Sequence, residues 1–400
     1  MSHERERSRR GWLRVCGGVG LGGIAGCLRL AEGGSDGSDP GANGGETDPN
    51  GGSDGADGTP EERDFDVELV PTWERDVLFR VVTADGDFFT GHSEVTRVRP
   101  DGGVVFETEP FADDHATLIR SGWRNALYVD GSGCFVGTRP DGDDEGARMH
   151  AFDSETGTRR WTFEEPADGL HDNVRATTRT EDLVVYASMS SGSGSDQEPI
   201  VRALDATTGD ERWEIGYEEG FIPGIFPYDG RLLVQRTFGL SVHDLETREL
   251  IEELSVGAGF NRAALDDGTL YLPGDTVRAL SLPSGEERWS VDTGREINTS
   301  PTLDDAALFV GTEAGFLLAF DRETGESLWE NRVGGVIGQP PVVDGDLVWV
   351  ASERGDLSAF TRRTGDLRYE VAVEPGFTFA VSDGILLDSK RGTAFEIRTT

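Results

Sequence analysis

The sequence predicts an all-β fold, a β-propeller of four-stranded blades, and two observations support this prediction. From Arg63 onward, short runs of valine, leucine, phenylalanine and tyrosine alternate with Asp-Gly turns, without a long helical period. The pattern Ala-x-Asp-x-x-Thr-Gly-x-x-x-Trp also recurs, with a period of about 40 residues. A repeat of this length is typical of propellers, whose blades close into a ring.

The clearest unit shows how each element follows from its residues. Leu308–Thr312 and Gly315–Asp321 are expected to form strands, and the turn Arg322–Gly325 leads into a third strand that contains Trp329. Asp321 can accept hydrogen bonds from backbone amides of the turn, and Gly325 can adopt the positive φ that ends it. The unit therefore predicts two hairpins in succession.

The same unit recurs along the chain, and its aromatic residue follows the alanine by ten positions. The predicted blade-docking aromatics are Trp161, Trp213, Trp289, Trp329 and Tyr369, and the matching turn glycines are Gly157, Gly209, Gly285, Gly325 and Gly365. A degraded copy starts at Val242, with Arg248 at the glycine position and Glu252 at the aromatic position. A further weak copy is expected from Thr96 through Gly102 to Phe106.

The number of units predicts the number of blades. Eight anchors are recognisable, at positions 96, 151, 203, 242, 279, 319, 359 and 394. The last unit ends with the chain and lacks its outer strand, whereas Trp73 lies in a spare strand upstream that resembles the tryptophan-bearing strands. We expect this N-terminal strand to complete the last blade, which closes the ring and removes unpaired edges. Seven blades is the alternative, if the unit at Thr96 is not a blade.

These motifs resemble the repeat of the quinoprotein-type, or PQQ-like, β-propeller family over residues 63–400. In that family the tryptophan docks between neighbouring blades, so the resemblance implies a structural role for the aromatics, Trp73 included. Some members are dehydrogenases that bind pyrroloquinoline quinone and calcium and carry adjacent cysteines over the cofactor. Cys134 has no adjacent cysteine, so we assign neither a quinone site nor calcium ligands.

The N-terminus predicts export and lipid attachment. Arg9 and Arg10 precede a short apolar stretch and resemble a twin-arginine signal, and Cys27 ends a sequence that resembles a lipobox. Residues 1–26 would then be a signal peptide of the kind found in a halophilic archaeon. Residues 27–62 would be the lipid-anchor cysteine and a disordered tether rich in glycine, serine and aspartate. The propeller would occupy residues 63–400, held at the outer face of the cytoplasmic membrane.

The charge of the chain limits its partners. Seventy-five acidic residues against 37 basic ones give a net charge of −38. Nucleic acid is excluded as a partner, because its binding depends on cations that displace counterions from phosphates. The acidic, lysine-poor composition resembles that of proteins from salt-accumulating halophiles, since concentrated salt screens self-repulsion. A surface meant for one cationic partner is the alternative.

No catalytic or metal-binding motif emerges. The histidines show no metal-ligand spacing, and Asp141–Glu145 is expected to be a solvated loop rather than a calcium site. Early units are longer than later ones, and the additions are assigned to Gly131–Arg148 and Ser188–Pro199, which we expect on one binding face.

The sequence therefore favours a monomeric, non-catalytic scaffold that binds an envelope or secreted protein. By layout its nearest analogue is the lipoprotein propeller of outer-membrane protein assembly. A quinone-dependent oxidoreductase and an extracellular ligand-sensing domain are the alternatives.

Overall fold

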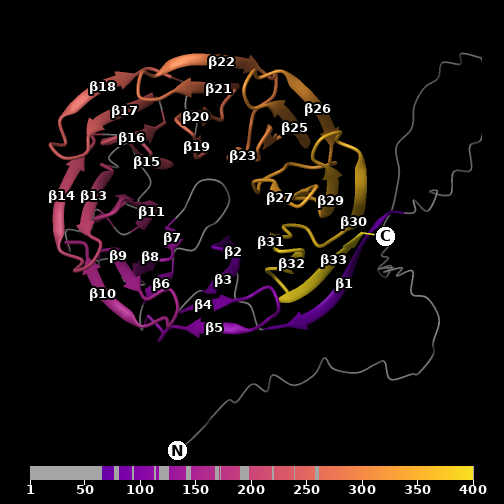
Figure 1. Cartoon of the computed structure of the whole chain (residues 1–400), viewed down its shortest axis with the longest axis horizontal. Coiled ribbons are helices and arrows are strands. Elements are labelled where there is room, and N and C mark those ends of the chain that lie inside the picture. Colours follow the sequence, from indigo (N-terminus) through magenta and orange to yellow (C-terminus); the bar gives the residue numbers. More distant parts are fainter. Residues whose placement is uncertain are drawn as a thin grey trace, which may run out of the picture. The chain divides into compact units, whose positions relative to one another are not determined.

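Eight antiparallel sheets follow one another around a ring (Figure 1). The computed structural model describes residues 65–75, 81–91, 94–111, 114–116, 126–140, 146–166, 171, 173–189, 198–218, 220–237, 239–256 and 261–399. The chain divides into two units, Met1–Glu61 and Glu62–Thr400, and all the described residues belong to the second. The all-β prediction is confirmed for these residues.

Blades 1–4 take up the first half of the ring. Blade 1 consists of β2 (Val81–Ala84), β3 (Asp87–Gly91), β4 (Val95–Val98) and β5 (Val104–Glu107). Blade 2 consists of β6 (Asp114–Ala116), β7 (Leu127–Asp130), β8 (Gly133–Pro140), β9 (Arg148–Phe152) and β10 (Arg159–Glu164). Blade 3 consists of β11 (Asn173–Arg179), β12 (Leu183–Met189), β13 (Ile200–Asp205) and β14 (Glu211–Gly216). Blade 4 consists of β15 (Gly224–Tyr228), β16 (Arg231–Arg236), β17 (Gly239–Asp244) and β18 (Leu250–Leu254).

Blades 5–8 complete the ring. Blade 5 consists of β19 (Ala264–Asp266), β20 (Thr269–Leu272), β21 (Thr276–Ser281) and β22 (Glu286–Asp292). Blade 6 consists of β23 (Thr302–Leu303), β24 (Ala307–Gly311), β25 (Phe316–Asp321) and β26 (Ser327–Arg332). Blade 7 consists of β27 (Val342–Asp344), β28 (Leu347–Ala351), β29 (Asp356–Thr361) and β30 (Leu367–Ala372). Blade 8 consists of β31 (Phe379–Ser382), β32 (Ile385–Asp388), β33 (Thr393–Thr399) and β1 (Val67–Glu74).

The ring closes as the repeat predicts. The N-terminal strand β1 pairs antiparallel with β33, with Val67 opposite Thr399 and Trp73 opposite Ala394. Figure 1 shows the two strands side by side on the rim, in the indigo and yellow that mark the two ends of the sequence. The prediction of eight blades is confirmed, and the alternative of seven is wrong because the unit at Thr96 forms blade 1.

The outer hairpin of the units that follow the consensus has the geometry that the repeat requires. Ala319 in β25 lies opposite Trp329 in β26, and the register then shifts, so that Phe320 faces Ser327. In the turn between these strands, one carboxylate oxygen of Asp321 accepts hydrogen bonds from the amides of residues 323 and 324, at 3.0 and 2.9 Å. Gly325 has φ +75°. The ten-residue spacing is therefore a cross-strand pairing around a turn that ends in glycine.

Two units depart from the consensus. In blade 1, Phe106 lies opposite Arg97 rather than Thr96, so the predicted anchor is off by one residue. The cause is a shorter turn, in which the Gly102 amide bonds to the carbonyl of residue 99, three residues back, instead of four as at Gly157. In blade 4, Val242 does lie opposite Glu252.

Blade 4 carries a strained residue at the turn position that glycine occupies elsewhere. Arg248 has φ +68°, a conformation that costs an L-residue roughly 1–2 kcal/mol. We expect Arg248→Gly to raise the free energy of unfolding by about 0.5–1 kcal/mol, since the larger entropy of glycine in the unfolded chain offsets part of the relief. Urea unfolding measures the change, and an unchanged or lower midpoint would contradict it.

The predicted insertion at Gly131–Arg148 is wrong in its extent, because Gly133–Pro140 is strand β8. Two short strands, β6 and β7, pair end to end along the same edge of β8 and together fill the innermost position of blade 2. Part of the extra length of this unit therefore precedes β7. Residues 190–197 and the expected solvated loop Asp141–Glu145 lie outside the described residues.

Candidate functional site

Tryptophans of one blade dock on the outer turn of the next. The Nε1–H group of Trp161 donates to the carbonyl of Ala206 at 3.2 Å, and that of Trp289 donates to the carbonyl of Arg322 at 3.1 Å. Trp329 and Trp73 donate in the same way to residues 362 and 100, at 3.0 and 2.9 Å. The rings lie so close to the turn glycines that an added Cβ would clash at Gly209, Gly325, Gly365 and Gly102.

The other candidate docking residues lie in variants of this arrangement. Gly157 packs against Phe106, and Gly285 packs against Leu254, so a non-tryptophan side chain takes the indole's place. Trp213 is buried in a cluster that includes Leu245 from the turn of blade 4. Tyr369 has no such turn to meet, because blade 8 is completed by β1 from the N-terminus, and its ring lies 6.0 Å from that of Phe65.

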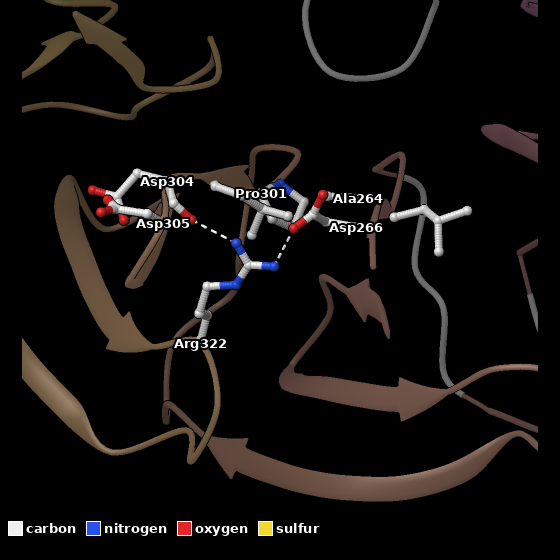
Figure 2. Close-up of a pocket in the computed structure, with 8 residues that line it drawn as sticks. Ala264, Asp266, Pro301, Asp304, Asp305 and Arg322 are labelled. Carbon is white, nitrogen blue, oxygen red and sulfur yellow. Dashed lines mark hydrogen bonds and ion pairs between the residues drawn. The ribbon is translucent and has the colours of Figure 1, made fainter. Parts of the chain in front are cut away.

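The cleft at blades 5 and 6 is a hollow of 440 Å³ on the surface (Figure 2). Three of its residues come from β19, four from β23 and the residues on either side of it, and one from the outer turn of blade 6. They are Ala264, Leu265, Asp266, Pro301, Leu303, Asp304, Asp305 and Arg322. Apolar groups therefore line part of this blade 5–6 cleft, and three carboxylates and one guanidinium line the remainder.

Arg322 connects the two blades that form the cleft. Its guanidinium forms an ion pair with Asp266 of blade 5 and donates to the carbonyl of Asp304 in its own blade at 2.7 Å, as Figure 2 shows. It also donates to the Tyr271 hydroxyl at 3.4 Å. Burial alone would lower the pKa of Arg322, but its bonds to Asp266 and Tyr271 raise it, so the charge is permanent.

Arg362 of blade 7 repeats this bridge to blade 6. Its guanidinium lies 3.2 Å from a carboxylate oxygen of Asp304 and 3.3 Å from one of Asp305. The Asp304 side chain is only 8% exposed, whereas those of Asp266 and Asp305 are 50% and 76% exposed. Asp266 and Asp305 are therefore the carboxylates in the cleft that an incoming group can reach.

A second polar cluster lies in blades 2 and 3, and its charged groups pair with one another. The buried side chain of Glu165 lies 2.9 Å from Arg202 and accepts hydrogen bonds from the hydroxyls of Tyr186 and Ser188, at 2.8 and 2.9 Å. Burial, and then the nearby Glu165 carboxylate, raises the pKa of Tyr186 well above its usual value. Mutual pairing of these groups favours a structural role over catalysis.

The other candidate titratable residues have structural contacts wherever the structure describes their side chains. His243 is bonded to the Tyr217 hydroxyl at 2.9 Å, and His171 to the carbonyl of Glu198 at 2.8 Å. Burial raises the pKa of the Cys134 thiol to about 12, which disfavours its reactive thiolate. Among the described residues, no group of three or more histidines, cysteines or carboxylates could hold a metal ion.

His150 makes stability depend on pH. Its ring bonds to Thr138 and Thr162, and burial lowers its pKa from 6.5 to about 3. As the pH falls below 6.5 the unfolded chain takes up this proton first, so stability is lost towards pH 3. We expect the parent protein to lose about 3 kcal/mol more than His150→Gln between pH 7 and pH 4. Urea unfolding across this range tests the difference, and parallel pH profiles would contradict it.

Arg9, Arg10 and Cys27, the residues of the predicted signal and lipid anchor, lie outside the described residues. Within the part of the chain that is described, no helix is long and apolar enough to cross a membrane.

Solved structures share this architecture at low sequence identity. BamB from Moraxella catarrhalis aligns over 83% of this chain and 97% of its own, with a TM-score of 0.61 and 19% identity. The computationally designed Ika8 protein aligns over 83% and 99%, with a TM-score of 0.59 and 14% identity. The quinohemoprotein alcohol dehydrogenase ADHIIG from Pseudomonas putida HK5 aligns over 84% and 76%, with a TM-score of 0.57 and 13% identity. No curated protein sequence gave a match.

A closed ring of eight blades, with tryptophans docked on the turns of their neighbours, defines a PQQ-like β-propeller. A family model described as outer membrane protein assembly factor BamB matches residues 71–215 and 273–391. Because these segments make up more than half of the chain, the protein belongs to this family.

Proposed function

We propose that this protein is an exported, lipid-anchored and non-catalytic scaffold that binds protein partners at the cell envelope. Its membership of the family described as an outer membrane protein assembly factor carries the proposal. In this reading Arg9 and Arg10 direct export, Cys27 carries the lipid, and the propeller presents its surface to an envelope or secreted protein. The likeness to a quinohemoprotein dehydrogenase is one of fold, at 13% identity.

The distribution of polar groups supports a binding role. The buried charges of blades 2 and 3 pair with one another, and His150, His171 and His243 are bonded to neighbouring hydroxyl and carbonyl groups. In contrast, the blade 5–6 cleft combines apolar groups with two exposed carboxylates on a frame that Arg322 holds in place. Such a combination of apolar contact area and charged margin is typical of protein interfaces.

Crosslinking in intact cells at their native salt concentration tests the proposal. We expect the full chain to crosslink to an envelope or secreted protein, and Cys27→Ser to release it from the membrane fraction without unfolding the propeller. Capture of cytoplasmic proteins alone, or unchanged membrane association of Cys27→Ser, would contradict the proposed location and anchor. Dye reduction by the purified protein with pyrroloquinoline quinone, calcium and an alcohol would instead favour an oxidoreductase.

A further inference from the structure

The blade 5–6 cleft has a surplus of negative charge that its own arginines do not cancel. Asp266 ends β19 of blade 5, and Asp304 and Asp305 lie in the inner turn of blade 6. Three carboxylates therefore face two guanidiniums, those of Arg322 and Arg362. Asp346, whose side chain is 87% exposed, adds a fourth carboxylate beside Arg362 at 3.7 Å.

The two bridging arginines distinguish this part of the ring. Both follow directly after the residue that starts the outer turn, at a position that is mostly small or apolar in the preceding blades. In blades 2–7 this position is Ser154, Ala206, Leu245, Leu282, Arg322 and Arg362. In blades 6 and 7 the guanidiniums reach back to the inner hairpin of the preceding blade and pair with its carboxylates.

The contacts of Arg322 disfavour an anionic ligand. Its Nε donates to Tyr271, one terminal nitrogen to the carbonyl of Asp304, and the other to Asp266. An incoming anion would have to displace these bonds and approach the exposed carboxylates of Asp266 and Asp305 against repulsion. A cation between these two carboxylates would instead lower the unbalanced charge of the cleft.

The apolar residues of the cleft favour a cation carried on a chain rather than a free ion. Pro301 is buried, and Leu265 and Leu303 are half-buried beside the carboxylates. They offer aliphatic surface to the methylene stem of a lysine or arginine and to an adjoining apolar side chain. The volume of 440 Å³ accommodates a few side chains and not a folded domain.

We propose that the blade 5–6 cleft binds an extended basic segment of a partner protein. A lysine or arginine lies between Asp266 and Asp305, and a flanking aliphatic side chain packs on Leu265, Pro301 and Leu303. This inference rests on the proposed scaffold function and names the chemistry of its partner.

Fluorescence anisotropy with a labelled pentapeptide tests the cleft directly. The probe carries arginine between two leucines, and its matched control carries glutamine instead. We expect the full chain to bind the arginine peptide, more tightly at about 0.15 M than at about 2 M KCl. Asp305→Asn should weaken binding about fivefold and Asp305→Arg should abolish it, because an exposed ion pair contributes on the order of 1 kcal/mol.

Asp229→Asn is the matched control, since Asp229 lies in the inner turn of blade 4 and does not line the cleft. It should bind the arginine peptide like the parent protein, and thermal unfolding should show that all three variants remain folded. Equal binding of the glutamine peptide would overturn the proposal. An equal loss of binding in Asp229→Asn would also overturn it, because the attraction would then be that of an acidic surface in general.

The cellular crosslinking separates this inference from the scaffold function. If Asp305→Arg captures the same partner in the same yield as the parent chain, the basic-segment proposal fails and the scaffold function stands. If the parent chain captures no envelope or secreted protein although the purified cleft binds the arginine peptide selectively, the scaffold function fails and the cleft chemistry stands.

Discussion

Removal of residues 63–78 is expected to lower the free energy of unfolding by about 5 kcal/mol or more, because it takes β1 out of blade 8. The deletion exposes the partner edge of β33 and removes the buried side chain of Val67 and the half-buried ones of Leu69 and Trp73. Each such side chain contributes about 1.5–3 kcal/mol when fully buried. The docking bond from the Trp73 indole to the carbonyl of residue 100, at 2.9 Å, is lost as well.

Deletion of residues 28–60 is the matched control. It removes a longer stretch of chain but none of the residues that form a blade, so stability should not change. Urea unfolding followed by tryptophan fluorescence compares the two deletions with the parent protein. Equal stability of the chain lacking residues 63–78 would show that β1 does not close the ring.

This closure was predictable because the repeat specifies what each blade needs. The last unit has an inner pair of strands and an anchor at Ala394 but no residues left for an outer strand. The spare strand at Trp73 carries the indole at the position that the repeat assigns to it. The pairing of Trp73 with Ala394 therefore follows from the same alanine–tryptophan relation as the pairing of Ala319 with Trp329.

The cleft was not predictable in the same way, because its contacts are not part of the repeat. Arg322 and Asp266 are 56 residues apart, and Arg362 and Asp304 are 58 residues apart. The sequence does show arginine at the same position in two consecutive units, which is a usable signal. Its partners become evident only when the ring brings the inner turn of one blade beside the outer turn of the next.

Spacing alone also misplaced the extra residues of blade 2. The long interval between anchors in that unit reflects two short strands, β6 and β7, that share one edge of β8. A period measures length but does not show whether added residues form a loop or a strand. The assignment of Gly131–Arg148 to an insertion failed for this reason, since the alternating residues of β8 lie within it.

Trp289→Ala is expected to destabilise the protein by about 3–5 kcal/mol, the range for loss of a buried aromatic side chain. Trp289 is 8% exposed, packs on Tyr271 with ring centroids 6.0 Å apart, and bonds to the carbonyl of Arg322. Its loss loosens the turn that holds Arg322, so the arginine peptide should bind more weakly as well. Urea unfolding and peptide anisotropy on the same variant measure both effects.

A double-mutant cycle with Gly325→Ala distinguishes docking of the indole from a general loss of core volume. A Cβ at Gly325 would lie 2.7 Å from the Trp289 ring, and the residue has φ +75°. In the parent protein Gly325→Ala thus incurs a clash and backbone strain, whereas in Trp289→Ala only the strain remains. We expect the two losses to fall short of additivity by more than about 1 kcal/mol. Strict additivity would mean that the Trp289 indole does not pack against the turn at Gly325. The position of Arg322 in the cleft would then not depend on the indole.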